Sequence, residues 1–119
     1  AAYYATIRAS DAELKRILDY GKQIEEKINL GHDRTDVEQK FHKAIAKATH
    51  NEFMDKLMPV IFQGIDKGVI LSQKNERVAK DTINDHQMIM EFMEARNPEG
   101  ARSAMKIHIL HAMKDLGIE

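Results

Sequence analysis

Three of the six histidines in this sequence of 119 residues fall at positions where an imidazole ring could bind a ligand or take part in chemistry. His86 and His108 each lie in the middle of an apolar helix face, and a buried imidazole needs a polar partner. The apolar residues that share these faces are Ala79, Ile83, Ile89, Met90 and Met93 for His86, and Ala101, Ala104, Met105 and Ala112 for His108. Neither face offers an obvious local partner, so a partner is expected from elsewhere in the fold.

The third histidine, His42, follows a carboxylate, Glu38, by four residues. On a helix this spacing places both side chains on one side, one turn apart, where they can chelate one ion. Three imidazole nitrogens and one carboxylate oxygen suit Zn²⁺, Ni²⁺ or a similar ion better than Ca²⁺ or Mg²⁺. The spacing therefore predicts a metal site formed by Glu38, His42, His86 and His108.

A simpler interpretation remains open, in which each of these histidines is a core residue hydrogen-bonded to a backbone carbonyl. The other three histidines, His32, His50 and His111, fall at helix boundaries or on a more polar side. We expect these three to be solvated or to cap helix ends, and no function is assigned to them.

Composition limits what kind of protein can present these side chains. The chain has 43% hydrophobic and 31% charged residues, which is typical of one folded domain, here residues 1–119. It has no Cys, which excludes thiolate metal ligands and fits a reducing cytoplasm, and no apolar run long enough to cross a bilayer. Because 18 Lys and Arg nearly balance 19 Asp and Glu, direct DNA binding by this chain is not expected.

Apolar residues recur with helical spacing throughout, and no window alternates with period two, so the sequence predicts an all-α antiparallel bundle of about six helices. Ser10 and Glu13 form a capping box before a helix that begins at Asp11. The other boundaries expected are a helix over 2–8, a stop at 29–31, a helix capped by Asp33 that runs to about Ala48, a helix from Glu76, and a last helix capped by Asn97 that ends near Gly117.

Between these helices, a third long apolar segment is expected to begin at Asn51 and to lie near the centre of the domain. Its apolar residues are Phe53, Met54, Leu57, Met58, Ile61, Phe62 and Ile65. Pro59 is expected to kink this helix rather than end it. Residues 68–75 are expected to form a connection.

Three segments of the sequence resemble motifs of the FCD domain, the C-terminal effector domain of FadR-type GntR transcription regulators. The first segment, from Glu38 through Phe41 and His42 to Asn51, resembles Asp-x-x-Phe-His followed by Ala-Ser-x-Asn. The second, 85–93, resembles Glu-His-x-x-Ile-x-x-Ala-Ile, and the third, 97–108, resembles Gly-Asp-x-x-x-Ala-Arg-x-Ala-Met-x-x-His. With the Ala-rich start of the chain, the resemblance covers nearly its whole length.

This resemblance implies a metal held by an acidic residue and three histidines, which match Glu38, His42, His86 and His108. The family usually has Asp where this chain has Glu38. The resemblance further implies a homodimeric sensor that binds a small carboxylate metabolite, with a winged helix-turn-helix DNA-binding domain that precedes Ala1 and is absent from this chain. Arg34, four residues before Glu38, is either an exposed first-turn residue or the partner of a ligand carboxylate.

Two other classes of function remain as alternatives. A metal-dependent hydrolase could use the same ligands to activate water, but the residues three before His42, His86 and His108 are Gln39, Ile83 and Met105, so no di-iron Glu-x-x-His pair is present. We therefore do not expect an enzyme. A structural dimerisation bundle without metal is the second alternative.

Overall fold

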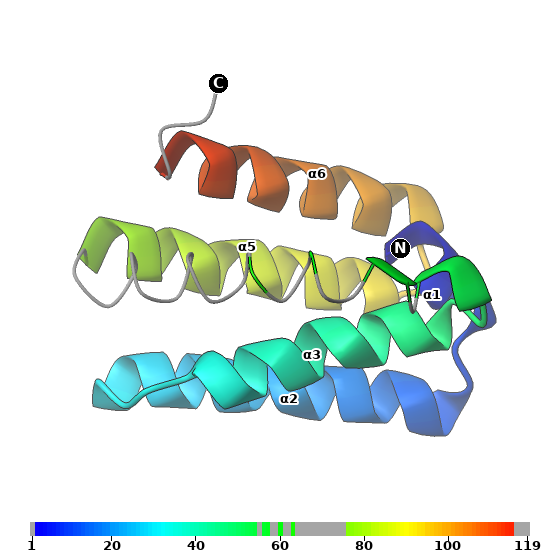
Figure 1. Cartoon of the computed structure of the whole chain (residues 1–119), viewed down its shortest axis with the longest axis horizontal. Helices are drawn as coiled ribbons and strands as arrows, with labels where there is room; N and C mark the ends of the chain where they lie inside the picture. The colour runs from blue at the N-terminus through cyan, green and yellow to red at the C-terminus, as the bar shows by residue number, and fades with distance from the viewer. Residues whose placement is uncertain (1, 55, 58–59, 61–62, 64–75, 116–119) are drawn as a thin grey trace.

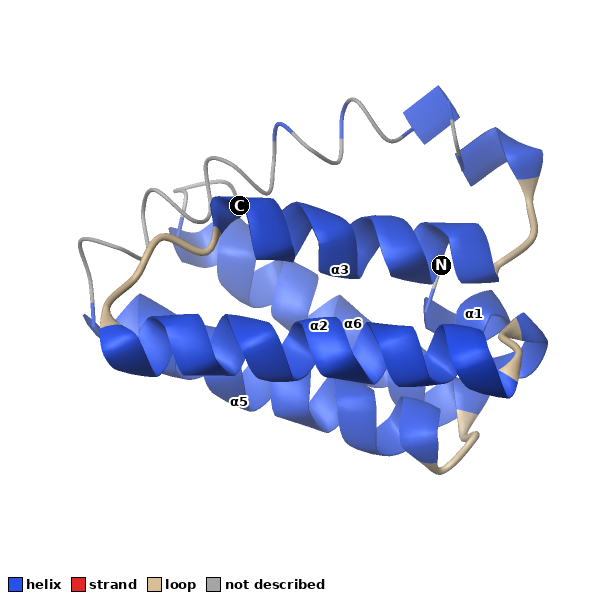
Figure 2. Ribbon diagram, turned by 90° about the horizontal axis from the view of Figure 1, so that it is seen from below, coloured by secondary structure: helices blue, strands red, loops and turns tan. Residues whose placement is uncertain are grey.

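A computed structural model describes residues 2–54, 56–57, 60, 63 and 76–115 of the chain. Within these ranges it contains five helices with defined bounds and no strand: α1 (Ala2–Arg8), α2 (Asp11–Leu30), α3 (Thr35–Ala48), α5 (Glu76–Glu94) and α6 (Pro98–Asp115). Figures 1 and 2 show α2, α3, α5 and α6 as a bundle in which α3 is antiparallel to α2 and α6 is antiparallel to α5, with α1 across one end. The all-α antiparallel fold expected from the sequence is confirmed.

Both ends of α2 lie where the sequence predicts them. Glu13 donates its backbone N–H to the Ser10 hydroxyl (3.1 Å), and the Glu13 carboxylate accepts the Ser10 N–H (3.0 Å), which completes the capping box. The helix ends before Gly31, which has a φ of 70° and donates its N–H to the carbonyl of Ile28. Glycine adopts this left-handed conformation without steric cost, so it stops the helix.

Helix α3 begins one residue later than the Asp33 cap predicts. Arg34 occupies the N-cap position and makes no side-chain capping hydrogen bond. The Asp33 carboxylate instead accepts the N–H of Thr35, two residues on (3.0 Å), and also its hydroxyl (2.8 Å). Asp33 therefore forms an Asx-type turn before the helix, a common competitor of the N-cap arrangement. The end of α3 at Ala48 is as predicted.

Helices α5 and α6 also begin where predicted. The Asn97 side chain accepts the N–H of Gly100 (2.9 Å), and Pro98 opens α6, where its missing N–H costs nothing. The described part of α6 extends to Asp115, and the predicted end near Gly117 lies outside the described residues. The predicted connection over 68–75 lies outside them as well.

A close approach of α2 to α3 and α5 sets the position of the helices that carry His42 and His86. A Cβ atom added to Gly21 would clash with the sulfur of Met90, and it would lie 3.2 Å from the Phe41 ring. Phe41 is fully buried, and its ring centroid lies 4.9 Å from that of His86. A larger residue at position 21 would force the end of the Met90 side chain to move and would press on the Phe41 ring.

The expectation that the segment after Asn51 lies at the centre of the domain is wrong for its described residues. Asn51 does act as the predicted cap, since its side chain accepts the N–H of Phe53 (2.9 Å), and residues 52–54 are helical. However, Phe53 and Leu57 are exposed, and so is Val60. Apolar character around a helix identifies burial only when other elements cover it. Among the described residues, the core cluster comes mainly from α1, α2, α3, α5 and α6. Met58, Pro59, Ile61, Phe62 and Ile65 lie outside the described residues.

The short helix α1 is attached to the bundle through side chains that bind backbone carbonyls. Arg96, at the end of α5, donates to the carbonyls of Thr6 (3.1 Å) and Ala9 (2.8 Å), and Arg8 donates to the carbonyl of Thr49 (2.9 Å). These bonds satisfy carbonyls at helix ends that have no intrahelical partner. Among the described residues, no helix has the length and apolar character needed to span a membrane.

Candidate metal centre

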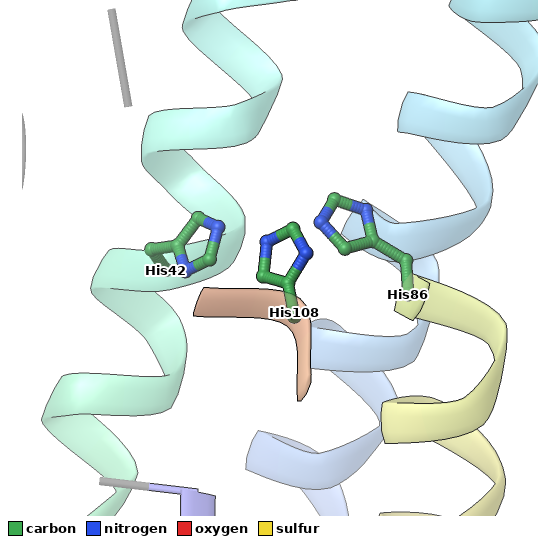
Figure 3. Close-up of side chains that lie close together, drawn as sticks. All are labelled: His42, His86 and His108. Carbon is green, nitrogen blue, oxygen red and sulfur yellow. The ribbon is translucent and has the colours of Figure 1, made fainter. Parts of the chain in front are cut away.

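Three histidines from three different helices converge in the interior of the bundle: His42 of α3, His86 of α5 and His108 of α6. One ring nitrogen of each lies within 4.8 Å of the corresponding atoms of the other two. Figure 3 shows the three imidazoles turned toward one another. Their ring centroids are 6.0 Å apart for His42 and His86, 6.1 Å for His42 and His108, and 4.9 Å for His86 and His108. The three residues are close enough to hold one metal ion.

The carboxylate of Glu38 lies beside two of these rings. Its Oε2 atom is 3.6 Å from Nε2 of His42, one helical turn further along α3, and 3.8 Å from Nε2 of His86. Glu38 is buried, with an exposed fraction of 4%. The fold thus brings together all four residues that the sequence predicts as ligands, from three helices.

Arg34 also lies in this cluster, and the interpretation of Arg34 as an exposed first-turn residue is wrong. The residue has an exposed fraction of 3%, and its Nη1 atom lies 3.6 Å from Oε1 of Glu38. The i to i+4 spacing along α3 brings the guanidinium to the other carboxylate oxygen, away from the histidines. The carboxylate of Glu38 therefore has a buried, positively charged guanidinium next to its Oε1 atom.

Burial sets the protonation of His86. It lowers the pKa of this imidazole from 6.5 to about 3, so the ring is neutral at physiological pH. Neither of its ring nitrogens has a hydrogen-bond partner among the described residues. A neutral imidazole with an unused nitrogen lone pair, buried beside two other histidines, has the form required of a metal ligand.

Glu38 is held in its ionised form despite its burial. Burial alone would raise its pKa, but His86, His42 and Arg34 together outweigh that effect and lower the pKa. The cluster therefore places an anionic carboxylate beside imidazole nitrogens. Nitrogen with some oxygen suits Zn²⁺, Ni²⁺ and related transition-metal ions.

One residue of this region, Asp85, is absent from the set predicted from the sequence. Its carboxylate is buried, with Oδ2 at 3.2 Å from Nδ1 of His108 and at 2.8 Å from Nδ1 of His111. Burial acts to raise the pKa of Asp85, but its hydrogen bonds with His108 and His111 lower it overall. Asp85 was not predicted because it directly precedes His86, and adjacent helical residues point about 100° apart, so Asp85 lies off the apolar face that identified His86. The available signal was the acidic residue before the histidine in the motif at 85–93.

The three remaining histidines differ from one another. His32 and His50 are exposed, as expected. His111 is only partly solvated: its side chain is 45% exposed, yet its Nδ1 contacts both carboxylate oxygens of Asp85. The expectation of a solvated His111 is therefore incomplete, because the partner that holds it belongs to another helix.

Comparison with known proteins identifies the family of this chain. The family model of the FCD domain matches residues 1–111. A curated relative, the Uxu operon regulator of Haemophilus influenzae, is 27% identical over 116 residues, which cover 91% of this chain and 42% of the relative. The chain thus spans about two-fifths of the length of that regulator. With the match of the family model over most of its residues, the chain belongs to the FCD domain family.

Proposed function

We propose that this chain is the effector-binding and dimerisation domain of a GntR/FadR-type transcription regulator, which senses a small carboxylate metabolite with the help of a bound divalent metal. Membership of the FCD family and likeness to an operon regulator support the regulatory class and argue against an enzyme. The main observation that supports a bound metal is the convergence of His42, His86 and His108 within the bundle.

The residues that would hold the metal are Glu38, His42, His86 and His108, and Zn²⁺ or Ni²⁺ fits them best. The strongest support from the residues present is His86, whose two ring nitrogens are buried without a hydrogen-bond partner among the described residues. A core histidine satisfied by a backbone carbonyl would use at least one of them. When bound, the ion would supply positive charge and coordination positions for a carboxylate.

Arg34 is the proposed second contact of the effector carboxylate. Its guanidinium is buried within 3.6 Å of Glu38, so it adds positive charge on the far side of that residue. A planar guanidinium can bind a carboxylate through two parallel hydrogen bonds. Sugar acids and hydroxy acids are both candidate effectors.

The rest of the proposal concerns the regulator as a whole. Because this chain is close to electrically neutral, DNA contact is assigned to a winged helix-turn-helix domain that precedes residue 1, with 1–119 as one sensing domain. The working form is a homodimer in the cytoplasm, and the effector changes how the dimer presents its DNA-binding domains. The alternatives are a metal-free dimerisation bundle and a metal-dependent hydrolase.

A thermal-shift screen tests this proposal. Purified chain is first analysed for Zn and Ni, and then heated with a panel of hydroxy acids and sugar acids, in the presence and absence of a chelator. We expect about one metal per chain, a lower melting temperature in chelator, and a stabilising carboxylate whose effect depends on the metal. Protein that contains no metal and takes up neither Zn²⁺ nor Ni²⁺ would favour the metal-free bundle. Metal-dependent hydrolysis of an added ester or phosphoester would favour the enzyme.

A further inference from the structure

Among the described residues, Asp85 is the buried carboxylate outside the predicted ligand set that contacts the histidine cluster, and it does so through His108. Oδ2 of Asp85 lies 3.2 Å from Nδ1 of His108. We propose that Asp85 is a positioning residue, which holds the His108 ring by Nδ1 and so leaves its other nitrogen, Nε2, to bind the metal. This inference rests on the proposed metal site and adds a residue that acts through one of its ligands.

The protonation of a neutral imidazole depends on its hydrogen-bond partner. Such a ring carries a proton on one nitrogen and a lone pair on the other, and the hydrogen-bond partner decides which nitrogen is which. A carboxylate can only accept, so a hydrogen bond from His108 to Asp85 requires the proton to be on Nδ1. The lone pair of His108 is then on Nε2, as metal coordination through that atom requires.

The carboxylate of Asp85 is itself held in one orientation. It is buried, with an exposed fraction of 4%, and it accepts from Nδ1 of His111 at 3.0 Å and 2.8 Å as well as from His108. His108 and His111 are three residues apart on α6, so both rings reach one carboxylate on the facing side of α5. Two donors from one helix therefore hold the carboxylate in a single orientation.

The third step is that this contact distinguishes His108 from the fully buried ligand beside it. Packing alone sets the orientation of His86, since neither of its nitrogens has a hydrogen-bond partner among the residues described. His108 is less buried, with 17% of its side chain exposed, and its ring has more room to turn. A hydrogen bond to a carboxylate would hold the His108 ring in one orientation.

The helix arrangement makes one element responsible for two tasks. Asp85 directly precedes His86 in the sequence. Helix α5 therefore supplies both a proposed ligand and the residue that orients a second proposed ligand on α6. Among the described helices, α5 and α6 share the most extensive contact. The spacing between these two ligands is therefore tied to the best-packed interface of the bundle.

The wild-type chain provides the first test. In metal-free protein labelled with ¹⁵N-histidine, two-bond ¹H–¹⁵N spectra report which nitrogen of His108 carries the proton, and His108→Ala assigns its signals. We expect the proton on Nδ1. A proton on Nε2 with none on Nδ1 in the wild-type chain would overturn the inference without the need for any Asp85 variant.

Substitution of Asp85 provides the second test, with competition against a chromogenic chelator for Zn²⁺ and Ni²⁺. Asp85→Asn keeps the size but replaces the carboxylate, and we expect metal affinity to fall between about tenfold and 100-fold. The matched control His111→Ala removes the other donor to Asp85 and should change affinity less than threefold. In a His108→Ala background, Asp85→Asn should add no further loss, because its effect passes through His108.

These results separate the inference from the proposed function. If the wild-type chain binds metal and Asp85→Asn binds it equally well, the positioning role is wrong and the metal site stands. If Asp85→Asn weakens binding to the same extent with and without His108, Asp85 acts by another route, and the inference fails. If the wild-type chain binds neither ion, the metal site itself is wrong and the inference falls with it.

Discussion

Two regions of this molecule pair histidine with glutamate, and they differ in their surroundings more than in their distances. At the surface, Nε2 of His50 lies 3.0 Å from Oε1 of Glu13, and the two side chains are 57% and 31% exposed. In the interior, Glu38 lies 3.6 Å and 3.8 Å from His42 and His86, with 5% of its own side chain exposed. The shorter of these distances therefore belongs to the pair at the surface, His50 and Glu13.

The comparison shows that a short distance is a poor guide to function. Water can satisfy every polar atom of the His50–Glu13 pair and screens its attraction, so such pairs contribute little. Around Glu38, water is excluded, and polar atoms of His86 stay without a hydrogen-bond partner among the described residues. An unsatisfied buried polar atom costs about 1–3 kcal/mol, so it is the interior cluster that points to a missing ligand.

The largest effect expected is on metal affinity when an interior histidine is replaced. His86→Leu fills a similar volume without a ligating nitrogen, and His108→Ala removes the ring from a less buried position. Each should weaken Zn²⁺ binding by about 100-fold or more, which is about 2.8 kcal/mol. Competition with a chromogenic chelator measures this, and metal-free His86→Leu should unfold at the same or a higher temperature than the wild-type chain, because a buried unpaired imidazole is removed.

The surface histidine supplies the control for these two variants. His50 has a φ of 54°, a conformation that Asn tolerates, so His50→Asn is the matched substitution. We expect its metal affinity to equal that of the wild-type chain. Equal losses in all three variants would show that metal binds through exposed histidines and that the interior cluster is not the site.

Helix periodicity was sufficient to find the members of the interior cluster but not their surroundings. The predicted set of Glu38, His42 and His86 depends on which residues share a face of one helix, and the sequence determines that directly. The partner of His108 depends on how α5 and α6 rotate against each other, which no single helix specifies. Asp85 was missed for this reason.

Burial was harder to predict than helix position. Arg34 is buried although a first-turn arginine is ordinarily solvated, because Glu38 one turn later is itself buried and attracts it. Phe53 and Leu57 are exposed although their segment is apolar, because apolar character alone does not bring a helix face into contact with other helices. Both outcomes depend on the assembly of several helices, which the pattern within one segment does not contain.

The second prediction concerns the pH dependence of stability in chelator. The pKa of His86 is lowered to about 3 in the folded chain, while an unfolded histidine has the ordinary value of about 6.5. Between pH 7 and pH 5 the unfolded chain therefore takes up a proton at this residue and the folded chain does not. The free energy of unfolding should fall by about 2 kcal/mol over this range, a loss that begins as the pH drops through the unfolded pKa.

His86→Leu isolates this contribution, since all other titratable groups remain. Urea unfolding of metal-free protein at pH 7 and pH 5 should give a decrease about 2 kcal/mol larger in the wild-type chain than in His86→Leu. Glu38 and Asp85 have lowered pKa values and stay ionised over this window. Equal decreases in both proteins would mean that His86 takes up its proton in the folded state.

The third prediction is a coupling between metal and effector. If a carboxylate contacts the metal and Arg34, the best compound from the thermal-shift screen should bind metal-loaded protein at least tenfold more tightly than metal-free protein, a coupling of about 1.4 kcal/mol. Calorimetry with both forms measures it, and the compound should tighten metal binding by the same factor. Equal affinities would assign the metal a purely structural role.

The smallest effect is expected at the surface pair, where the same chemical groups lie at the shorter distance. In His50→Asn, Glu13 keeps the backbone N–H of Ser10 as a partner at 3.0 Å, so the start of α2 remains capped. Exposed ion pairs contribute between about 0 and 1 kcal/mol, and we expect a loss of stability below about 0.5 kcal/mol that shrinks further in 1 M salt. Urea unfolding at low and high salt measures this difference. A salt-independent loss above about 2 kcal/mol would show that the contact between the start of α2 and the end of α3 is as important for the fold as the interior cluster, and distance rather than burial would then be the better guide.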